Sequence, residues 1–160
     1  MSTYIVEGGR PLEGSVRVHG AKNSVLPILA ACLLAPGECV IHNCPELSDV
    51  RASLDILRRL GCRAERQGEA VVVDASAPTG WEVPDALMRE MRSSVIFLGA
   101  ILGRMGQAQM CAPGGCELGP RPIDLHLSAI RALGGAVVEA EGGLRCSGRL
   151  RGAGIVLSLP

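Results

Sequence analysis

One short stretch of the chain, residues 113–126, holds four side chains that could take part in chemistry. Cys116 offers a thiol, Arg121 a guanidinium, Asp124 a carboxylate and His126 an imidazole. Two adjacent glycines precede the cysteine, and prolines flank the arginine on both sides, so the backbone of this loop has few accessible conformations. Such a loop can present the thiol and the guanidinium to a ligand at a small entropic cost.

A second candidate position is Lys22, because fifteen of the sixteen basic residues are arginine and this is the only lysine. Its ammonium is a compact charge that the wide guanidinium of arginine does not reproduce. Lys22 and Asn23 lie where a glycine-containing turn enters a predicted helix, and free backbone N–H groups at a helix start attract anions. From the residues alone, a solvated lysine beside an asparagine helix cap is the default interpretation.

The composition favours a globular protein whose ligands are small molecules. Sixteen basic and sixteen acidic side chains give a formal net charge of zero, so no overall field attracts nucleic acid or a membrane surface. Hydrophobic residues make up 48% of the 160 residues, which is enough for one substantial core. Any site for an anion must therefore be built from local groups.

The cysteines and the start of the chain predict a reduced, cytoplasmic protein. The seven cysteines are an odd number, form no zinc-type pairs and lie mostly in apolar runs. They occupy positions 32, 39, 44, 62, 111, 116 and 146. The first residues, Met-Ser-Thr-Tyr-Ile-Val-Glu-Gly, match neither a signal peptide nor a transit sequence, and the apolar runs stop short of membrane length. We expect no membrane segment.

The order of predicted elements repeats along the chain, which indicates an internal duplication. The first unit, about 22–75, is predicted as a helix, a strand, a helix ended by Gly61 and two short strands. The second unit, about 84–147, has the same order, with Gly134 at the equivalent helix end. Aligning the two glycines matches the closing hairpins without a gap. Residues 148–160 are predicted to begin a third unit.

Three of the predicted helices have distinct burial patterns. Residues 23–34 are almost uniformly apolar and predict a helix nearly enclosed by its domain. Residues 48–60 predict a half-buried helix with Ser48 as its N-cap and with Val50, Leu54 and Leu57 on its buried face. Residues 85–102 predict one continuous helix whose apolar stripe leaves Arg92 off the core face.

Three segments together resemble the UDP-N-acetylglucosamine enolpyruvyl transferases. Residues 20–27, Gly-Ala-Lys-Asn-Ser-Val-Leu-Pro, are similar to the N-terminal signature of that family. Residues 91–94 are similar to its central arginine motif, and residues 113–126 to its catalytic loop. The three motifs occur in the family's order and the resemblance covers essentially the whole chain, so the match is specific.

The resemblance implies an α/β fold of inside-out barrels, each built from three repeated units whose helices pack inward. By this analogy residues 1–21 are a strand segment that belongs with a second domain. Residues 22–160 would then be a partial enolpyruvyl transferase domain with an incomplete barrel. The family's general base and further arginines lie in its second half, so we expect a truncated chain that is inactive alone and needs the missing C-terminal domain.

The family transfers the enolpyruvyl group of phosphoenolpyruvate to the 3-hydroxyl of UDP-N-acetylglucosamine, the first committed step of peptidoglycan synthesis. The resemblance implies addition followed by elimination, with Cys116 as the proton donor and the target of fosfomycin. It places phosphoenolpyruvate against Lys22, Asn23 and Arg121. It places UDP-N-acetylglucosamine against Arg92, Arg121, Pro122, Ile123, Asp124 and Leu125. It implies no cofactor and no metal.

Each assignment has a simpler interpretation from the residues alone. Cys116 is then a small apolar residue in a turn, Arg92 a solvated helix arginine and Asp124 a helix cap. His126 has no second histidine or carboxylate at metal spacing, and a packed or hydrogen-bonded role is the commoner one. Two other functions stay open: a non-catalytic module that binds a nucleotide sugar, and a different enolpyruvyl transferase such as the shikimate-pathway enzyme.

Overall fold

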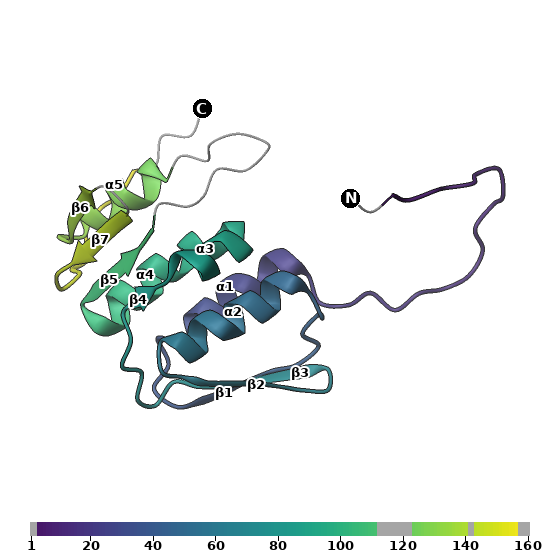
Figure 1. Cartoon of the computed structure of the whole chain (residues 1–160), viewed down its shortest axis with the longest axis horizontal. Coiled ribbons are helices and arrows are strands. Elements are labelled where there is room, and N and C mark those ends of the chain that lie inside the picture. The colour runs from purple at the N-terminus through teal and green to yellow at the C-terminus, as the bar shows by residue number, and fades with distance from the viewer. Residues whose placement is uncertain (1–2, 112–122, 141–142, 157–160) are drawn as a thin grey trace.

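The computed structural model describes residues 3–111, 123–140 and 143–156, and Figure 1 shows how their helices and strands are arranged. The first group of elements is α1 (Lys22–Cys32), β1 (Glu38–Ile41), α2 (Ser48–Arg59), β2 (Arg63–Gln67) and β3 (Ala70–Asp74). The second group is β4 (Glu82–Val83), α3 (Asp85–Glu90), the 3-10 helix η1 (Arg92–Val95), α4 (Ile96–Met105), β5 (Gln107–Met110), α5 (Asp124–Ala132), β6 (Ala136–Ala140) and β7 (Gly143–Ser147). The fold is α/β, as predicted.

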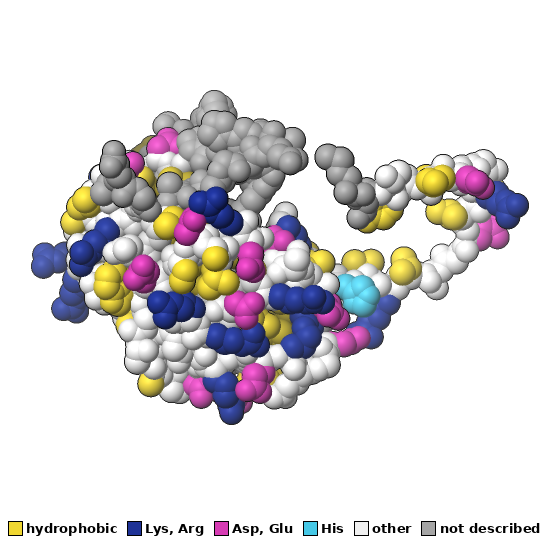
Figure 2. Space-filling model, in the orientation of Figure 1, with side chains coloured by type: hydrophobic (Ala, Val, Ile, Leu, Met, Phe, Trp, Pro, Cys, Tyr) yellow, Lys and Arg dark blue, Asp and Glu magenta, His cyan; other side chains and the backbone are white. Residues whose placement is uncertain are grey.

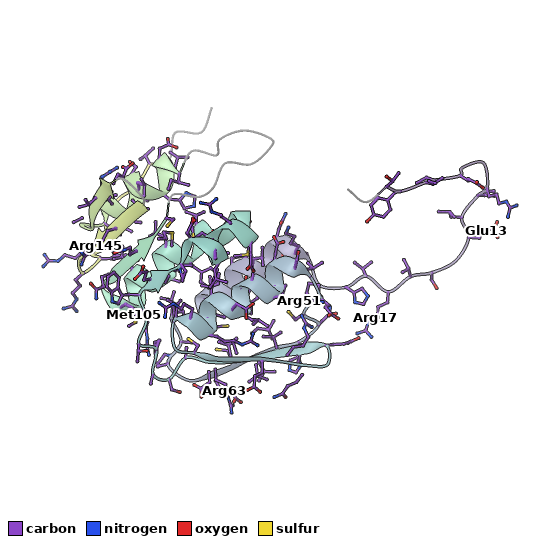
Figure 3. The ribbon with its side chains drawn as sticks, viewed as in Figure 1. Glu13, Arg17, Arg51, Arg63, Met105 and Arg145 are labelled. Atoms are coloured by element: carbon purple, nitrogen blue, oxygen red, sulfur yellow. The ribbon has the colours of Figure 1, made fainter. Side chains whose placement is uncertain are left out.

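The first unit places α1 and α2 on one face of an antiparallel sheet with the strand order β1-β3-β2 (Figure 1). Successive side chains of a strand alternate between the two faces, and Val71 and Val73 of β3 are fully buried. Arg63 of β2 points away from the helices, and its guanidinium lies 3.0 Å from the Glu38 carboxylate (Figure 3). The sheet therefore has one apolar, covered face and one polar face.

The second unit repeats this topology. Strands β5, β7 and β6 form an antiparallel sheet in the same relative order as β1, β3 and β2, with α4 packed against β5 and α5 against β6. The short strand β4 adds a parallel neighbour to β5. The link between β5 and α5, residues 111–123, is longer than the link between β1 and α2, residues 42–47. The segment with Cys116 and Arg121 is thus the longer of the two links.

Backbone hydrogen bonds recur at equivalent places in the two units. The Gly61 N–H donates to the Arg58 carbonyl and the Gly134 N–H to the Arg131 carbonyl, both at 3.0 Å. Further matched pairs, donor first, are Cys62 to Leu57 with Gly135 to Ile130, and Ala75 to Gly37 with Gly148 to Gly106. Because each N–H finds its partner at the same place in its unit, the two units have the same local fold and not only the same order of elements.

The predicted continuous helix over 85–102 is wrong. It is divided into α3, η1 and α4, because Met91 has extended backbone angles of φ −134° and ψ 114°. This conformation keeps Met91 buried, and the buried Ser94 hydroxyl donates to the Met88 carbonyl at 3.4 Å. Burying the side chains on both sides of the break stabilises the fold more than one continuous helix would.

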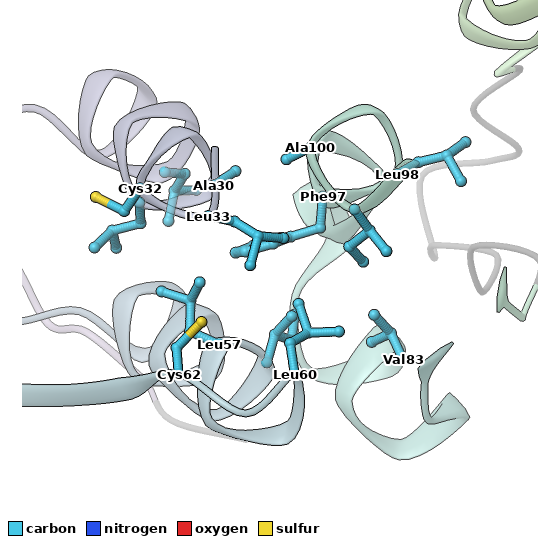
Figure 4. Close-up of a cluster of buried hydrophobic side chains, with 14 of the residues drawn as sticks. Ala30, Cys32, Leu33, Leu57, Leu60, Cys62, Val83, Phe97, Leu98 and Ala100 are labelled. Atoms are coloured by element: carbon cyan, nitrogen blue, oxygen red, sulfur yellow. The ribbon is translucent and has the colours of Figure 1, made fainter. Parts of the chain in front are cut away.

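The core lies between α1, α2 and α4. Leu57 of α2 and Phe97 of α4 are fully buried, as are Leu33 and Leu60, which directly follow α1 and α2, and the four side chains face one another (Figure 4). The predicted apolar face of α2 is confirmed, since Val50, Leu54 and Leu57 are all buried. The prediction that the first helix is nearly enclosed is wrong along one side, because Ile28 and Leu34 are about half exposed.

The three predicted helix caps are absent. Ser48, Asn23 and Asp124 each lie inside the first turn of their helices, and the N-cap positions belong to Leu47, Ala21 and Ile123. None of these helix starts has a side-chain cap hydrogen bond. The side chains of Asn23 and Asp124 are exposed and therefore accessible to a ligand.

The first residues of the described chain extend away from the two units, as the positions of Glu13 and Arg17 show (Figure 3). Residues 3–20 form no helix or strand, and apolar side chains among them, such as Tyr4, Leu12 and Val16, are almost fully exposed. Residues 151–156 likewise form no strand, so the expected opening of a third unit has no strand partner within the described residues. The assignment of residues 1–21 to a second domain stays a prediction.

Charged side chains of both signs are interspersed on the face shown in Figure 2, in keeping with the balanced composition. Among the described residues, no helix combines the length and the apolar character needed to cross a membrane.

Candidate active site

The starts of α1 and α2 lie side by side and bring together a lysine and an aspartate. Lys22 Nζ lies 2.6 Å from Asp49 Oδ2, and the Lys22 side chain is 50% exposed whereas that of Asp49 is 17% exposed. Lys22 is thus an ion-paired group with an open side. Sequence analysis missed Asp49 because nothing in its local pattern marks it; the two residues meet only through the packing of the helices.

The turn before Lys22 rests on the loop between β1 and α2. A Cβ atom at Gly20 would collide with the Asn43 carbonyl oxygen and lie 3.3 Å from Pro45 Cδ, so only glycine fits without a shift. Arg66 holds the opposite side of this loop by donating to the Cys44 carbonyl at 2.9 Å and the Pro45 carbonyl at 2.8 Å. These contacts determine where α1 begins and hence where Lys22 lies.

This end of the molecule favours an anion. The first N–H groups of a helix have no acceptor within the helix, and the helix dipole adds partial positive charge there. Lys22, Asn23 and Ser24 are all exposed in the first turn of α1. The Ser24 N–H already donates to the Ala21 carbonyl at 3.2 Å. The Lys22 ammonium and the backbone N–H groups of Lys22 and Asn23 can together receive a phosphate or carboxylate.

The break between α3 and α4 contacts helix α2. The Ser53 hydroxyl of α2 lies 3.3 Å from Met91 Sδ, directly before the start of η1 at Arg92. The backbone of Arg92 is therefore in a turn beside α2 and not in the middle of a long helix. The side chain of Arg92 lies outside the described part of the structure.

Most of the predicted catalytic loop also lies outside the described residues. This holds for Cys116, Arg121 and Pro122, whose assignments stay predictions. Of the remaining predicted residues, Ile123 is half-buried at the N-cap of α5, and Asp124 and Leu125 are exposed in its first turn. His126 is exposed too. Among the described residues, Lys22 and Asn23 lie together at the start of α1, and residues 123–126 lie together at the start of α5.

A cavity of about 300 Å³ lies beside the start of this loop, at the ends of β4 and β5. Glu82, Asp85, Gln109 and Cys111 contribute to its lining. Burial raises the pKa of the Cys111 thiol, and the neighbouring Asp85 carboxylate raises it further. Cys111 follows β5 and is half-buried. Its protonated thiol is a poor nucleophile.

The other described cysteines have the character of core residues. Cys32, Cys44, Cys62 and Cys146 are buried and unpaired, and burial is the main cause that raises the pKa of each thiol. For Cys32 burial, together with nearby Cys39, raises the pKa to about 12. The expectation that cysteines pack in the core is confirmed for these four.

Comparison with known proteins identifies the relatives of this chain. The family model described as EPSP synthase (3-phosphoshikimate 1-carboxyvinyltransferase) matches residues 6–160. UDP-N-acetylglucosamine 1-carboxyvinyltransferase 2 of Caldanaerobacter subterraneus subsp. tengcongensis is 49% identical over 161 residues, which cover 100% of this chain and 39% of that protein. UDP-N-acetylglucosamine 1-carboxyvinyltransferase 1 of Symbiobacterium thermophilum is 46% identical, with 98% and 37% covered.

The solved structures that resemble this chain include enolpyruvyl transferases. The enolpyruvyl transferase NikO from Streptomyces tendae has a TM-score of 0.76 and 30% sequence identity over 90% of this chain and 32% of that one. EPSP synthase from Acinetobacter baumannii has a TM-score of 0.59 at 20% identity, with 89% of this chain and 33% of that one covered, and supports the fold alone. The chain thus spans about two fifths of the length of its curated relatives. With a family match over nearly all its residues and this shared fold, the chain belongs to the EPSP synthase family of enolpyruvyl transferases.

Proposed function

We propose that this chain is the front part of an enzyme that transfers the enolpyruvyl group of phosphoenolpyruvate to the 3-hydroxyl of UDP-N-acetylglucosamine. The observation that carries the proposal is the exposed Lys22 ammonium at the paired helix starts, inside the segment that resembles the family's N-terminal signature. The names of relatives at 41–49% identity indicate which member of the family it is. The product would serve peptidoglycan synthesis in the cytoplasm.

In this proposal the start of α1 binds phosphoenolpyruvate. The ligand carries a phosphate and a carboxylate, and both need fixed cations or N–H donors. Lys22 and Asn23 provide these groups at the start of α1, and Arg121 adds a guanidinium from the loop. Fixed donors of this kind orient the substrate before the reaction begins.

Cys116 is the proposed acid. It gives its proton to the methylene carbon of phosphoenolpyruvate while the sugar 3-hydroxyl oxygen bonds to the neighbouring carbon, which bears the phosphate, and loses its own proton. In the second step the bond from this carbon to the phosphate oxygen breaks, phosphate leaves, and the methyl carbon loses a proton to restore the double bond. A poised thiol in a stiff loop meets the demand of the first step. The same thiol would react with fosfomycin.

The nucleotide sugar is assigned to the other end of the loop. Arg92 and Arg121 would pair with anionic oxygens, and residues 122–125 would contact the nucleotide. Asp124 and Leu125 are exposed in the first turn of α5 and are accessible for this role. The general base is expected in a C-terminal domain, which would also cover the site.

The test uses the protein that contains these 160 residues in its source cells. Intact mass shows its length, and an assay of phosphate release with both substrates measures turnover. We expect turnover to require both substrates, to be lost in Cys116→Ser, and to persist without fosfomycin sensitivity in Cys116→Asp. Turnover in Cys116→Ser equal to that of the unchanged protein would overturn the role of the thiol.

A second candidate is a transferase that acts on shikimate 3-phosphate, which the description of the matching family model favours. Phosphate release with that substrate, and none with UDP-N-acetylglucosamine, would establish it. A nucleotide-sugar binding module is the third candidate. It would bind UDP-N-acetylglucosamine, lose that binding in Arg121→Ala, and release no phosphate.

A further inference from the structure

We infer that Asp49 is a positioning residue, which holds the Lys22 ammonium in the one place where it can receive the phosphoenolpyruvate anion. The inference rests on the proposed function, because that function supplies the anion. It adds a residue outside the three motifs on which the family resemblance depends. The starting observation is the 2.6 Å ion pair between Lys22 Nζ and Asp49 Oδ2.

This ion pair differs from the others among the described residues. In the five other ion pairs both side chains are between 43% and 72% exposed, and pairs of that kind contribute little to stability because water and salt screen them. Asp49 alone is reduced to 17% exposure while its partner keeps 50%. The Asp49 side chain is thus largely covered by the protein, whereas half of the Lys22 side chain is exposed to solvent.

Asp49 is held in place from several directions. It lies in the first turn of α2, where the helix dipole favours a carboxylate. The Ser48 hydroxyl donates to Asp49 Oδ1 at 3.4 Å, and the Ser53 hydroxyl donates to the Asp49 carbonyl at 2.9 Å. Ser53 also contacts Met91 at the end of α3, so this turn of α2 is braced by a second helix. The anchored backbone of Asp49 and the low exposure of its side chain limit where the carboxylate can lie, so it can orient the flexible lysine stem.

The geometry leaves donors free for a ligand. A lysine ammonium has three N–H donors, and Asp49 accepts one of them. The exposed side of Lys22 can direct the others toward an anion at the start of α1. The short, fixed carboxylate thereby determines the position of the ammonium, whereas a longer carboxylate with the same charge would displace it.

The inference can be measured on the Lys22 ammonium itself. In the protein that contains these residues, the loss of one signal in Lys22→Arg identifies the side-chain ¹⁵Nζ and ¹³Cε NMR signals of Lys22, and a titration with phosphoenolpyruvate then follows them. Asp49→Glu keeps the charge and moves the carboxylate by one methylene group. Asp55→Glu makes the same change on the same helix at an exposed ion pair with Arg58, and it is the matched control.

We expect phosphoenolpyruvate to shift the Lys22 signals in the unchanged chain. Asp49→Glu should raise the dissociation constant about tenfold, which is the effect of losing one well-placed charge-assisted hydrogen bond. Asp55→Glu should leave it unchanged, and thermal unfolding should show that both variants fold. Equal affinity in folded Asp49→Glu and in the unchanged chain would overturn the positioning role and leave the proposed function intact. No response of Lys22 to phosphoenolpyruvate in the unchanged chain would overturn the anion site itself, and the inference with it.

Discussion

Gly61 and Gly134 end equivalent helices in the two units with nearly the same left-handed backbone angle, φ 91° and φ 87°. Each donates its N–H to the carbonyl three residues earlier, and each is followed by the same pattern of closing hydrogen bonds. The surroundings of the two glycines differ. A Cβ at Gly61 would lie 2.8 Å from Thr79 Oγ1 and 2.9 Å from the Thr79 nitrogen, whereas a Cβ at Gly134 would meet nothing within 4 Å.

This difference predicts unequal effects of the same substitution. Gly134→Ala should lower the free energy of unfolding by about 1 kcal/mol, because alanine is strained at a positive φ. Gly61→Ala should lower it by about 2 to 4 kcal/mol, because a collision with backbone is added to the strain. Urea denaturation measures both. Gly99→Ala in α4 is the control and should be neutral or stabilising, and equal losses at Gly61 and Gly134 would contradict the predicted collision.

Gly20→Ala should disturb the start of α1. The added methyl group would collide with the Asn43 carbonyl, so the turn or the loop between β1 and α2 must move. We expect a loss of about 1 to 3 kcal/mol in the free energy of unfolding, together with changed Lys22 NMR signals. Gly8→Ala has open space around its Cβ and should change neither measurement. Unaltered Lys22 signals in Gly20→Ala would show that this contact does not position the lysine.

The buried thiol of Cys32 should make the fold sensitive to alkaline pH. Its folded pKa is raised to about 12 from the ordinary value of 9.0, mainly by burial. Above pH 9 the unfolded chain releases this proton while the folded chain keeps it, so the unfolded state is favoured increasingly as the pH rises from 9 toward 12. Denaturation curves at pH 8 and pH 10.5 should show this loss. Cys32→Ala removes the thiol and should flatten this part of the pH profile; an unchanged profile would exclude Cys32 as the cause.

Native alkylation should distinguish the proposed catalytic thiol from the core thiols. Burial and raised pKa values protect Cys32, Cys62 and Cys146, since the thiolate is the reacting form. Brief treatment with iodoacetamide at pH 7.5, followed by peptide mass mapping, should therefore modify Cys116 first. Labelling of all seven cysteines in urea is the control. Faster modification of Cys62 or Cys146 would contradict the burial in the structure.

Short-range patterns in the sequence determined the helix of residues 48–59 and the closing hairpins. The spacing of Val50, Leu54 and Leu57 predicts one buried face, and Gly61 and Gly134 supply the angles that end a helix. The same reasoning found Lys22 and the loop around Cys116, because unusual residue types are visible without a fold. These features depend on neighbours within a few positions along the chain.

Tertiary packing decided the rest. The break at Met91 follows from burial on both sides of one residue, and a periodic pattern of apolar residues does not reveal it. Asp49 meets Lys22, and Gly20 meets Asn43, only because α1, α2 and the loop after β1 are packed together. Contacts between residues far apart in the chain depend on how whole elements sit against one another. The sequence by itself therefore determined which residues could do chemistry, and the tertiary structure decided which of their partners hold them in place.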